Sequence, residues 1–187
     1  MKLDQFKSEL SLANKLLRLI WGVVWYILFL PSPRPLYGWR RLLLRLFGAK
    51  IGAGVRVYGS AKIYYPPNLT LETNSIVGPH VDVYCVAPVT VGEDSMISQY
   101  SYLCAASHDY TQESLPLIAS PIVVGEQTWI CARAFVGPGV TIGRRSVIAA
   151  CSVVVKDVED SVVVGGNPAK FLKKVAANDT EDGAARQ

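Results

Sequence analysis

The sequence predicts a mainly β fold, a parallel β-helix of about five coils, and a six-residue period carries that prediction. From Ile51 to Val154 an aliphatic residue recurs at nearly every sixth position. Neither the 3.6-residue period of an α-helix nor the alternation of a plain strand produces a strict six. Hexapeptide repeats are typical of β-helices, whose stacked coils share one apolar core. The repeats begin at Ile51, Val57, Ile63, Leu71, Val77, Val83, Val91, Ile97, Leu103, Val124, Ile130, Val136, Ile142, Ile148 and Val154.

Two further positions in each repeat follow a pattern. A short side chain stands four residues after most repeat starts, and a glycine often follows the start directly. We expect the large aliphatic residue to fill the interior and the short one to pack where the chain turns. Glycine tolerates the positive φ angles that such turns use. Two-residue bulges are expected at Leu69–Thr70 and Val89–Thr90.

Domain organisation follows from where the period starts, breaks and stops. Residues 51–160 are expected to form the β-helix, with an external loop at 109–123. A solenoid needs caps at both ends, so residues 1–50 are expected as an N-terminal helical segment and 161–175 as a C-terminal cap with a short helix. Residues 176–187 are small and polar, a composition typical of a disordered tail.

Charge and apolar residues concentrate together in the first 50 residues. They carry nine Lys/Arg against two Asp/Glu, a balance of +7. The uncharged run Leu19 to Leu30 is too short to span a bilayer unaided, and Pro31–Pro35 ends it. Leu36 to Phe47 mixes leucines with arginines and a tryptophan, which suits a helix lying in a membrane interface. We interpret residues 10–47 as an interfacial or re-entrant hairpin on the inner face of the cell membrane, the alternative being a helical cap on the coils.

The cysteines and histidines limit the chemistry. The four cysteines, Cys85, Cys104, Cys131 and Cys151, fall at different offsets in their repeats and form no CxxC pair, so neither a disulfide framework nor a metal site is expected in a cytoplasmic protein. His80 and His108 are the two histidines. His108 ends a repeat directly before the external loop, and histidine suits proton transfer near neutral pH.

Other candidate residues lie near these histidines in the sequence. We interpret His80 as a stacked surface imidazole. Asp82 and Tyr84, one coil before His108, are candidates for orienting it or for binding acceptor hydroxyls. Asp109 and Tyr110 are candidate acceptor contacts at the start of the loop.

Several motifs resemble those of a known family. Ser107-His108-Asp109-Tyr110 followed by a flap, the stretch Val124 to Ile130 with Trp129, and Gly166-Asn167-Pro168-Ala169-Lys170 resemble the hexapeptide O-acetyltransferases. The segments Pro31–Pro35 and Leu46–Gly52 resemble the colanic-acid-biosynthesis type within that family. The resemblance covers roughly residues 10–175.

The resemblance implies a left-handed β-helix, a homotrimer with three sites between adjacent prisms, and acetyl-CoA as co-substrate without a metal. His108 would match the general base. Ala132 and Ala150 fall where backbone groups hold the pantetheine arm, and Trp129 would shape the groove wall. Lys170 and Lys173 fall where relatives contact the cofactor phosphates.

The acceptor remains open between several classes. Family acceptors are usually sugar hydroxyls, and a membrane-facing N-terminus suggests a lipid-linked exopolysaccharide repeat unit. An amino-sugar N-acetyltransferase is the main alternative, because both reactions use a histidine base. A non-catalytic scaffold, the metal-dependent carbonic-anhydrase branch and a longer acyl donor fit the residues less well. Nucleic acid is not an expected partner, because the basic segment is too apolar.

Overall fold

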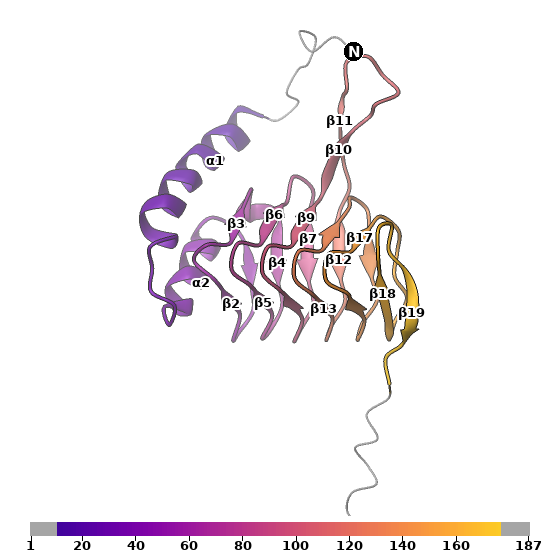
Figure 1. Ribbon diagram of the computed structural model, residues 1–187. Helices are drawn as coiled ribbons and strands as arrows, with labels where there is room; N and C mark the ends of the chain where they lie inside the picture. The colour runs from indigo at the N-terminus through magenta and orange to yellow at the C-terminus, as the bar shows by residue number, and fades with distance from the viewer. Residues whose placement is uncertain (1–10, 177–187) are drawn as a thin grey trace, which may run out of the picture.

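The computed structural model describes residues 11–176, and they form a three-sided parallel β-helix (Figure 1). Fifteen strands between β1 and β17, all except β10 and β11, make five turns around the prism, so the predicted solenoid is confirmed. We name the three faces sheets A, B and C. Sheet A contains β1 (Lys50–Ile51), β4 (Leu69–Leu71), β7 (Val89–Val91), β12 (Ile122–Val124) and β15 (Thr141–Ile142). Sheet B contains β2 (Arg56–Val57), β5 (Ile76–Val77), β8 (Met96–Ile97), β13 (Trp129–Ile130), β16 (Val147–Ile148), β18 (Val162–Gly165) and β19 (Lys170–Lys174). Sheet C contains β3 (Lys62–Ile63), β6 (Asp82–Tyr84), β9 (Tyr102–Cys104), β14 (Phe135–Val136) and β17 (Val153–Val154).

The periodic aliphatic residues form the core, as their spacing predicts. In sheet B, Val57 pairs with Val77 and Val77 with Ile97 in parallel register, and the same column continues through Ile130 and Ile148. All five side chains have no exposed surface. Each is worth about 1.5–3 kcal/mol of burial, so the column holds successive coils in register.

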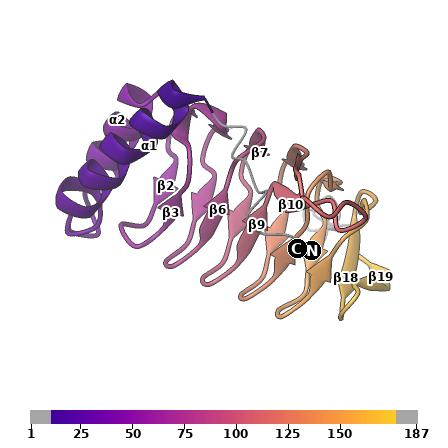
Figure 2. The same cartoon turned by 90° about the horizontal axis from the view of Figure 1, so that it is seen from above.

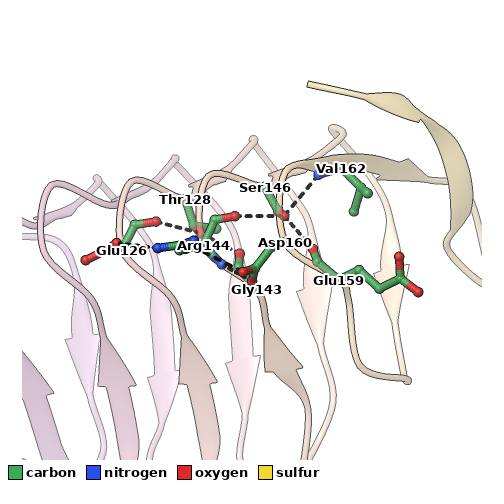
Figure 3. A network of polar contacts seen from close by, with 8 residues as sticks. All are labelled: Glu126, Thr128, Gly143, Arg144, Ser146, Glu159, Asp160 and Val162. Atoms are coloured by element: carbon green, nitrogen blue, oxygen red, sulfur yellow. Dashed lines mark hydrogen bonds and ion pairs between the residues drawn. The ribbon is translucent and has the colours of Figure 1, made fainter. Parts of the chain in front are cut away.

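The short residues at the corners also form hydrogen bonds between neighbouring coils. The Ser95 hydroxyl donates to Gly125 O at 2.7 Å, and Thr128 Oγ1 donates to Gly143 O at 3.0 Å. Ser146 repeats the arrangement one coil later, donating to Glu159 O at 2.6 Å and accepting from Val162 N at 3.2 Å (Figure 3). These buried hydroxyls therefore join each coil to the next through the backbone.

The repeat glycines serve a different purpose from the one expected. Positive φ occurs at the corners on non-glycine residues such as Asn74, Asp94 and Gln127. At Gly92 and Gly143 a Cβ would lie 2.6 Å from Glu126 N and 2.5 Å from Asp160 N. The glycines are needed because adjacent coils approach too closely for a side chain, and the expectation of positive φ at these positions was wrong.

The N-terminal helices cap the first coil. Helix α1 (Leu12–Val24) continues as the π-helical turn η2 (Trp25–Phe29), and α2 (Tyr37–Leu46) follows a turn at 31–35. Trp21 and Trp25 donate their indole N–H groups to Ile63 O at 2.7 Å and Ala61 O at 2.8 Å. Together with buried Phe29, these contacts dock the helical segment on the end of the prism (Figure 2). The inner face of the helical segment therefore caps the coils, as the alternative interpretation of residues 10–47 describes.

The C-terminal cap is not a helix, so that expectation was wrong. Residues Lys170–Lys174 form strand β19, antiparallel to β18. Gly165, Gly166 and Pro168 leave only a few residues for a helix, too short to be stable alone, whereas the edge of β18 offers backbone partners. The expected tail beyond residue 176 lies outside the described residues.

The segment expected as an external loop is a hairpin. Strand β10 (Ala106–His108) pairs antiparallel with β11 (Leu117–Ala119), and the pair projects away from the prism (Figure 1). It leaves at the corner between sheets C and A, after β9 and before β12.

Candidate active site

His108 is the last residue of β10 and lies opposite Leu117 in the hairpin. Its ring Nδ1 lies 2.7 Å from Leu115 O. A carbonyl oxygen only accepts, so Nδ1 carries the proton and a neutral ring has its lone pair on Nε2. The hairpin therefore fixes both the orientation and the tautomer of the imidazole, as a general base requires.

Asp109 braces the hairpin immediately beyond His108. Its carboxylate accepts from Thr111 N at 3.0 Å, Thr111 Oγ1 at 2.6 Å and Gln112 Nε2 at 2.8 Å. These hydrogen bonds hold the pKa of Asp109 below its ordinary value. The oxygens of Asp109 are thus engaged within the loop, while Tyr110 is exposed at the tip.

An aromatic row covers the outer face of sheet C. Tyr64 and Tyr84 have ring centroids 4.5 Å apart, Tyr84 and Tyr102 6.4 Å, and Tyr102 and Phe135 5.7 Å. Both views place β3, β6 and β9 between α1 and the hairpin along the prism axis (Figures 1 and 2). The row thus runs from the helical cap toward the strand that carries His108, and we call it the sheet C floor.

Asp82 lies on the sheet C floor between Lys62 and Tyr102. Burial raises the pKa of Asp82, and the charge of Lys62 opposes that rise. Burial likewise raises the pKa of the Tyr84 and Tyr102 hydroxyls. Asp82 and Tyr84 therefore offer an acceptor carboxylate and a neutral hydroxyl, the groups that suit binding of sugar hydroxyls.

His80 lies apart from this floor. Its ring stacks on Tyr100 with centroids 4.9 Å apart and planes 7° apart, and it is positioned at the corner between sheets B and C. The interpretation of His80 as a stacked surface imidazole is confirmed.

The residues expected at the cofactor share that same corner. Cys151 N donates to Ala132 O at 3.0 Å, which places Ala132 and Ala150 on successive coils. Trp129 stands nearby on β13, exposed, with its indole N–H donating to Ser98 Oγ at 2.9 Å. The alanine side chains at these two positions are small, as a close approach of a thin pantetheine arm to the backbone requires.

A groove of about 490 Å³ opens at the C-terminal end of the prism. Its walls include Val155, Pro168 and Phe171, and Lys156 and Lys170 bring two positive charges to it. Asp157 and Glu159 also line the groove, so its two positive charges are matched by two negative ones, and its apolar walls are the feature that fits an adenine. Lys173 is on the same strand as Lys170 but does not line this groove. Sequence reasoning missed Lys156, whose position in a coil gave no signal until β18–β19 folded beside it.

A single chain does not bring all these residues together. His108 projects at the corner between sheets C and A, whereas Ala132 and Ala150 lie at the corner between sheets B and C. The base and the expected cofactor corner therefore belong to different corners of one prism. Within residues 11–176 no group of three or more His, Cys, Asp or Glu side chains could hold a metal ion.

Known proteins share this sequence and architecture. The family model of the bacterial transferase hexapeptide (six repeats) matches residues 121–156. A protein named as a colanic acid biosynthesis acetyltransferase, WcaF of Escherichia coli (strain K12), is 46% identical over 155 residues, which are 83% of this chain and 85% of that protein. The crystal structure of a hexapeptide-repeat acetyltransferase from Vibrio cholerae complexed with acetyl coenzyme A has a TM-score of 0.83 at 28% identity, covering 91% of this chain and 93% of that one.

A galactoside acetyltransferase complexed with coenzyme A, at 24% identity and a TM-score of 0.84, shares the fold over 96% of this chain and 94% of that one. The similarity to acetyltransferases sets aside a non-catalytic scaffold. The chain belongs to the hexapeptide-repeat acetyltransferases, of the colanic-acid-biosynthesis type, and is an acetyl-CoA-dependent acyltransferase.

Proposed function

We propose that this enzyme transfers the acetyl group of acetyl-CoA to a sugar hydroxyl, with His108 as the general base. The observation that carries the proposal is the hydrogen bond from His108 Nδ1 to Leu115 O, which leaves Nε2 as the basic nitrogen of a neutral ring. Asp82 and Tyr84, on the neighbouring sheet C floor, bind and orient the acceptor.

The proposed reaction is a direct acyl transfer. Nε2 of His108 removes the proton of the acceptor hydroxyl as its oxygen attacks the thioester carbonyl. The carbon–sulfur bond breaks, coenzyme A leaves as a thiolate, and the imidazolium returns the proton to that sulfur. A backbone N–H stabilises the negatively charged oxygen that forms when the hydroxyl oxygen adds to the thioester carbonyl, a contribution that can exceed base catalysis.

The complete site lies between two copies of the chain in a homotrimer. The separation of His108 from Ala132 and Ala150 on different corners supports this assembly. A second prism beside the hairpin brings its own small-residue corner to the first prism's His108 and leaves the sheet C floor open to the acceptor. In this arrangement Trp129 forms part of the groove wall, while Lys170 and Lys173 contact the cofactor phosphates.

The acceptor is a lipid-linked glycan, reached at the inner surface of the cell membrane. The helical segment presents an apolar outer face although its inner face is docked. Among the described residues the stretch Leu12–Phe29 is long and apolar enough to cross a membrane, and 11% of it is buried. Because the two indole hydrogen bonds hold α1 and η2 on the coil, the segment lies along the membrane surface and does not cross the bilayer. The exposed large apolar residues of the helical segment are Leu12, Leu16, Leu19, Ile20, Val23, Tyr26, Ile27, Leu28, Leu36, Trp39, Leu42 and Leu46.

The test of His108 is coenzyme A release from acetyl-CoA over a panel of sugars, amino sugars and extracted lipid-linked glycans. His108→Ala is expected to cut turnover by about 10² to 10⁴ while leaving acetyl-CoA binding unchanged. Lys50→Ala, at an exposed position on sheet A of the first coil, is the control and should retain activity. Equal loss of binding and turnover in His108→Ala would contradict the base assignment. Release with amines alone would identify an N-acetyltransferase.

The test of membrane association uses point variants on the outer face. Deleting residues 1–47 would also uncover the end of the core that Trp21 and Phe29 protect, so loss of binding would be ambiguous. Leu19→Glu and Ile27→Glu change exposed positions only and should reduce pelleting with vesicles while the melting temperature stays unchanged. Val123→Glu, exposed on sheet A, is the control. Unchanged pelleting of both helix variants would exclude this surface.

A further inference from the structure

A cationic pocket lies where α1 crosses the first coil. It has a volume of about 280 Å³ and is lined by Arg18, Trp21 and Trp25 from the helical segment and by Lys62 and Tyr64 from the coil. This volume is close to the roughly 300 Å³ at which small-molecule sites begin. The indole hydrogen bonds to Ile63 O and Ala61 O fix the two tryptophans, so the walls of the pocket are formed before any ligand binds.

The two positive charges in the pocket are not neutralised by a contacting carboxylate. Across residues 11–176 the ion pairs are those of Arg144 with Glu126 and Asp160, at the far end of the prism. The Arg18 guanidinium lies 4.5 Å from the centroid of the Tyr64 ring and donates to its hydroxyl. Its Nε is buried and has no hydrogen-bond partner. A buried donor without a partner costs about 1–3 kcal/mol, and an anionic oxygen would satisfy it.

The pocket lies between two surfaces of different chemistry. On one side it shares Arg18 and Gly22 with an apolar groove along α1 that Leu19, Val23 and Ile27 line. On the other side Tyr64 begins the sheet C floor, which continues through Tyr84. A ligand crossing the pocket would thus pass from apolar side chains, to two cations, to stacked aromatic rings.

We propose that the Arg18–Lys62 pocket binds the phosphate or diphosphate that joins an apolar chain to the glycan acceptor. This assignment rests on the proposed function. The apolar chain lies along α1 toward the bilayer, the phosphate contacts Arg18 and Lys62, and the sugars extend over the aromatic floor. Asp82, one strand beyond Lys62, repels an anion that moves farther, so the sugars on the floor are uncharged near that point.

The strand spacing limits which sugar is modified. From β3 to β9 is two strand intervals, about 10 Å at the usual spacing, and the His108 hairpin follows β9. A phosphate held at Arg18 therefore leaves room for one or two sugar rings before the base. The acetylated hydroxyl belongs to a sugar close to the phosphate.

The experiment measures ligand binding, so it does not depend on finding the acceptor or on turnover. Farnesyl diphosphate is titrated into the full-length protein by calorimetry, with farnesol and inorganic pyrophosphate as partial ligands. Arg18→Gln and Lys62→Gln should each weaken farnesyl diphosphate binding about tenfold or more, the usual effect of losing a charge-assisted hydrogen bond. Farnesol binding should not change, and Arg18→Lys should restore part of the affinity.

The first coil supplies matched controls, because it carries one basic residue on each sheet. Lys50→Gln on sheet A and Arg56→Gln on sheet B remove the same charge from exposed positions away from the pocket. Both should bind like the unchanged protein. If these controls lose as much affinity as Lys62→Gln, or if Lys62→Gln and Arg18→Gln lose none, the pocket assignment is wrong.

A vesicle arm separates the acceptor phosphate from lipid headgroups. Pelleting is compared on vesicles of phosphatidylcholine alone and of phosphatidylcholine with phosphatidylglycerol. Arg18→Gln and Lys62→Gln should change pelleting no more than the two control variants do. A loss on anionic vesicles as large as the loss for farnesyl diphosphate would assign the charges to headgroups and overturn the proposal. Should Arg18→Gln fail to fold, Lys62→Gln decides the question alone, since Lys62 is exposed.

Discussion

Arg40 shows how a single charged side chain determines the shape of the N-terminal cap. It has no exposed surface, and no carboxylate of residues 11–176 forms an ion pair with it. Its guanidinium donates to Val57 O at 2.6 Å and to Ser32 O, Pro33 O and Arg34 O at 3.2, 3.0 and 2.6 Å. Burial lowers the pKa of Arg40. The arginine thus binds the turn between η2 and α2 to the first coil, because it donates to carbonyls of both.

Replacing Arg40 with methionine should destabilise the protein by about 3 kcal/mol or more, because the buried carbonyls lose their donors. Urea unfolding monitored by circular dichroism measures the change. Arg56→Met, at an exposed position on the same coil, should cost less than about 0.5 kcal/mol. A loss of unfolding free energy for Arg40→Met no larger than that for Arg56→Met would show that the turn does not depend on the Arg40 guanidinium.

Cys85 makes stability depend on alkaline pH. Burial raises the pKa of its thiol to about 11 from 9.0. Between these values the unfolded chain loses the thiol proton while the folded chain keeps it, so ionisation favours the unfolded state. Stability should fall as pH rises from about 9 to 11, at about 1.4 kcal/mol per unit. The difference in unfolding free energy between the unchanged protein and Cys85→Ala should shrink with this slope. A difference that does not change with pH would exclude ionisation of Cys85 as the cause of the alkaline loss of stability.

At the scale of elements, the hairpin β10–β11 holds the base away from the prism wall. Its strands pair through Ser107 with Ile118 and His108 with Leu117. Beyond His108 the Asp109 carboxylate gathers three donors and holds the tip in one conformation. Precise placement of a base matters because small misplacements can reduce rates severely.

Asp109→Ala should therefore lower turnover about tenfold or more while coenzyme A binding stays the same, since the change loosens the hairpin and not the cofactor corner. Hydrogen exchange at residues 115–117 should rise in parallel. Asp109→Asn keeps an acceptor oxygen, so its turnover should lie between those of Asp109→Ala and the unchanged protein. Full turnover in Asp109→Ala together with faster exchange would show that hairpin order does not limit the reaction.

Elements also differ in how well their sequences predicted them. The six-residue period predicted the coils correctly, because each repeat places one residue in the interior and one at a corner, whatever the rest of the chain does. Lys170–Lys174 was expected as a helix and is a strand, because its partner, the edge of β18, is set by tertiary stacking. Burial of Trp21 and Phe29 likewise depends on where the first coil ends, which the apolar pattern of residues 19–30 does not reveal.

For the whole molecule, the arrangement of corners predicts sites shared between copies. His108 and Ala150 lie at different corners of one prism, so a shared site takes the base from one copy and the cofactor corner from the next. In a cyclic assembly each copy then contributes to two sites.

Co-expression of His108→Ala with Ala150→Trp tests this sharing. Each variant alone should be inactive, the first without a base and the second with its corner blocked. Random mixed assemblies should recover about a quarter of full activity, because that fraction of interfaces combines an intact base with an intact corner. Recovery should be absent when the two purified variants are assayed together without exchange of subunits. Absence of recovery in co-expressed assemblies would place the whole site within one chain.

The sequence alone determined the solenoid, its number of coils, the position of the histidine loop and the apolar, basic character of the N-terminus. These depend on local periodicity and composition, which each short stretch of chain carries by itself. Tertiary structure alone decided the strand at the C-terminus, the inter-coil hydroxyl bonds, the groove that Lys156 shares with Lys170, and the meeting of Arg18 with Lys62. Those features join residues far apart in the chain, and their contacts exist only once the coils stack and the helices dock on them.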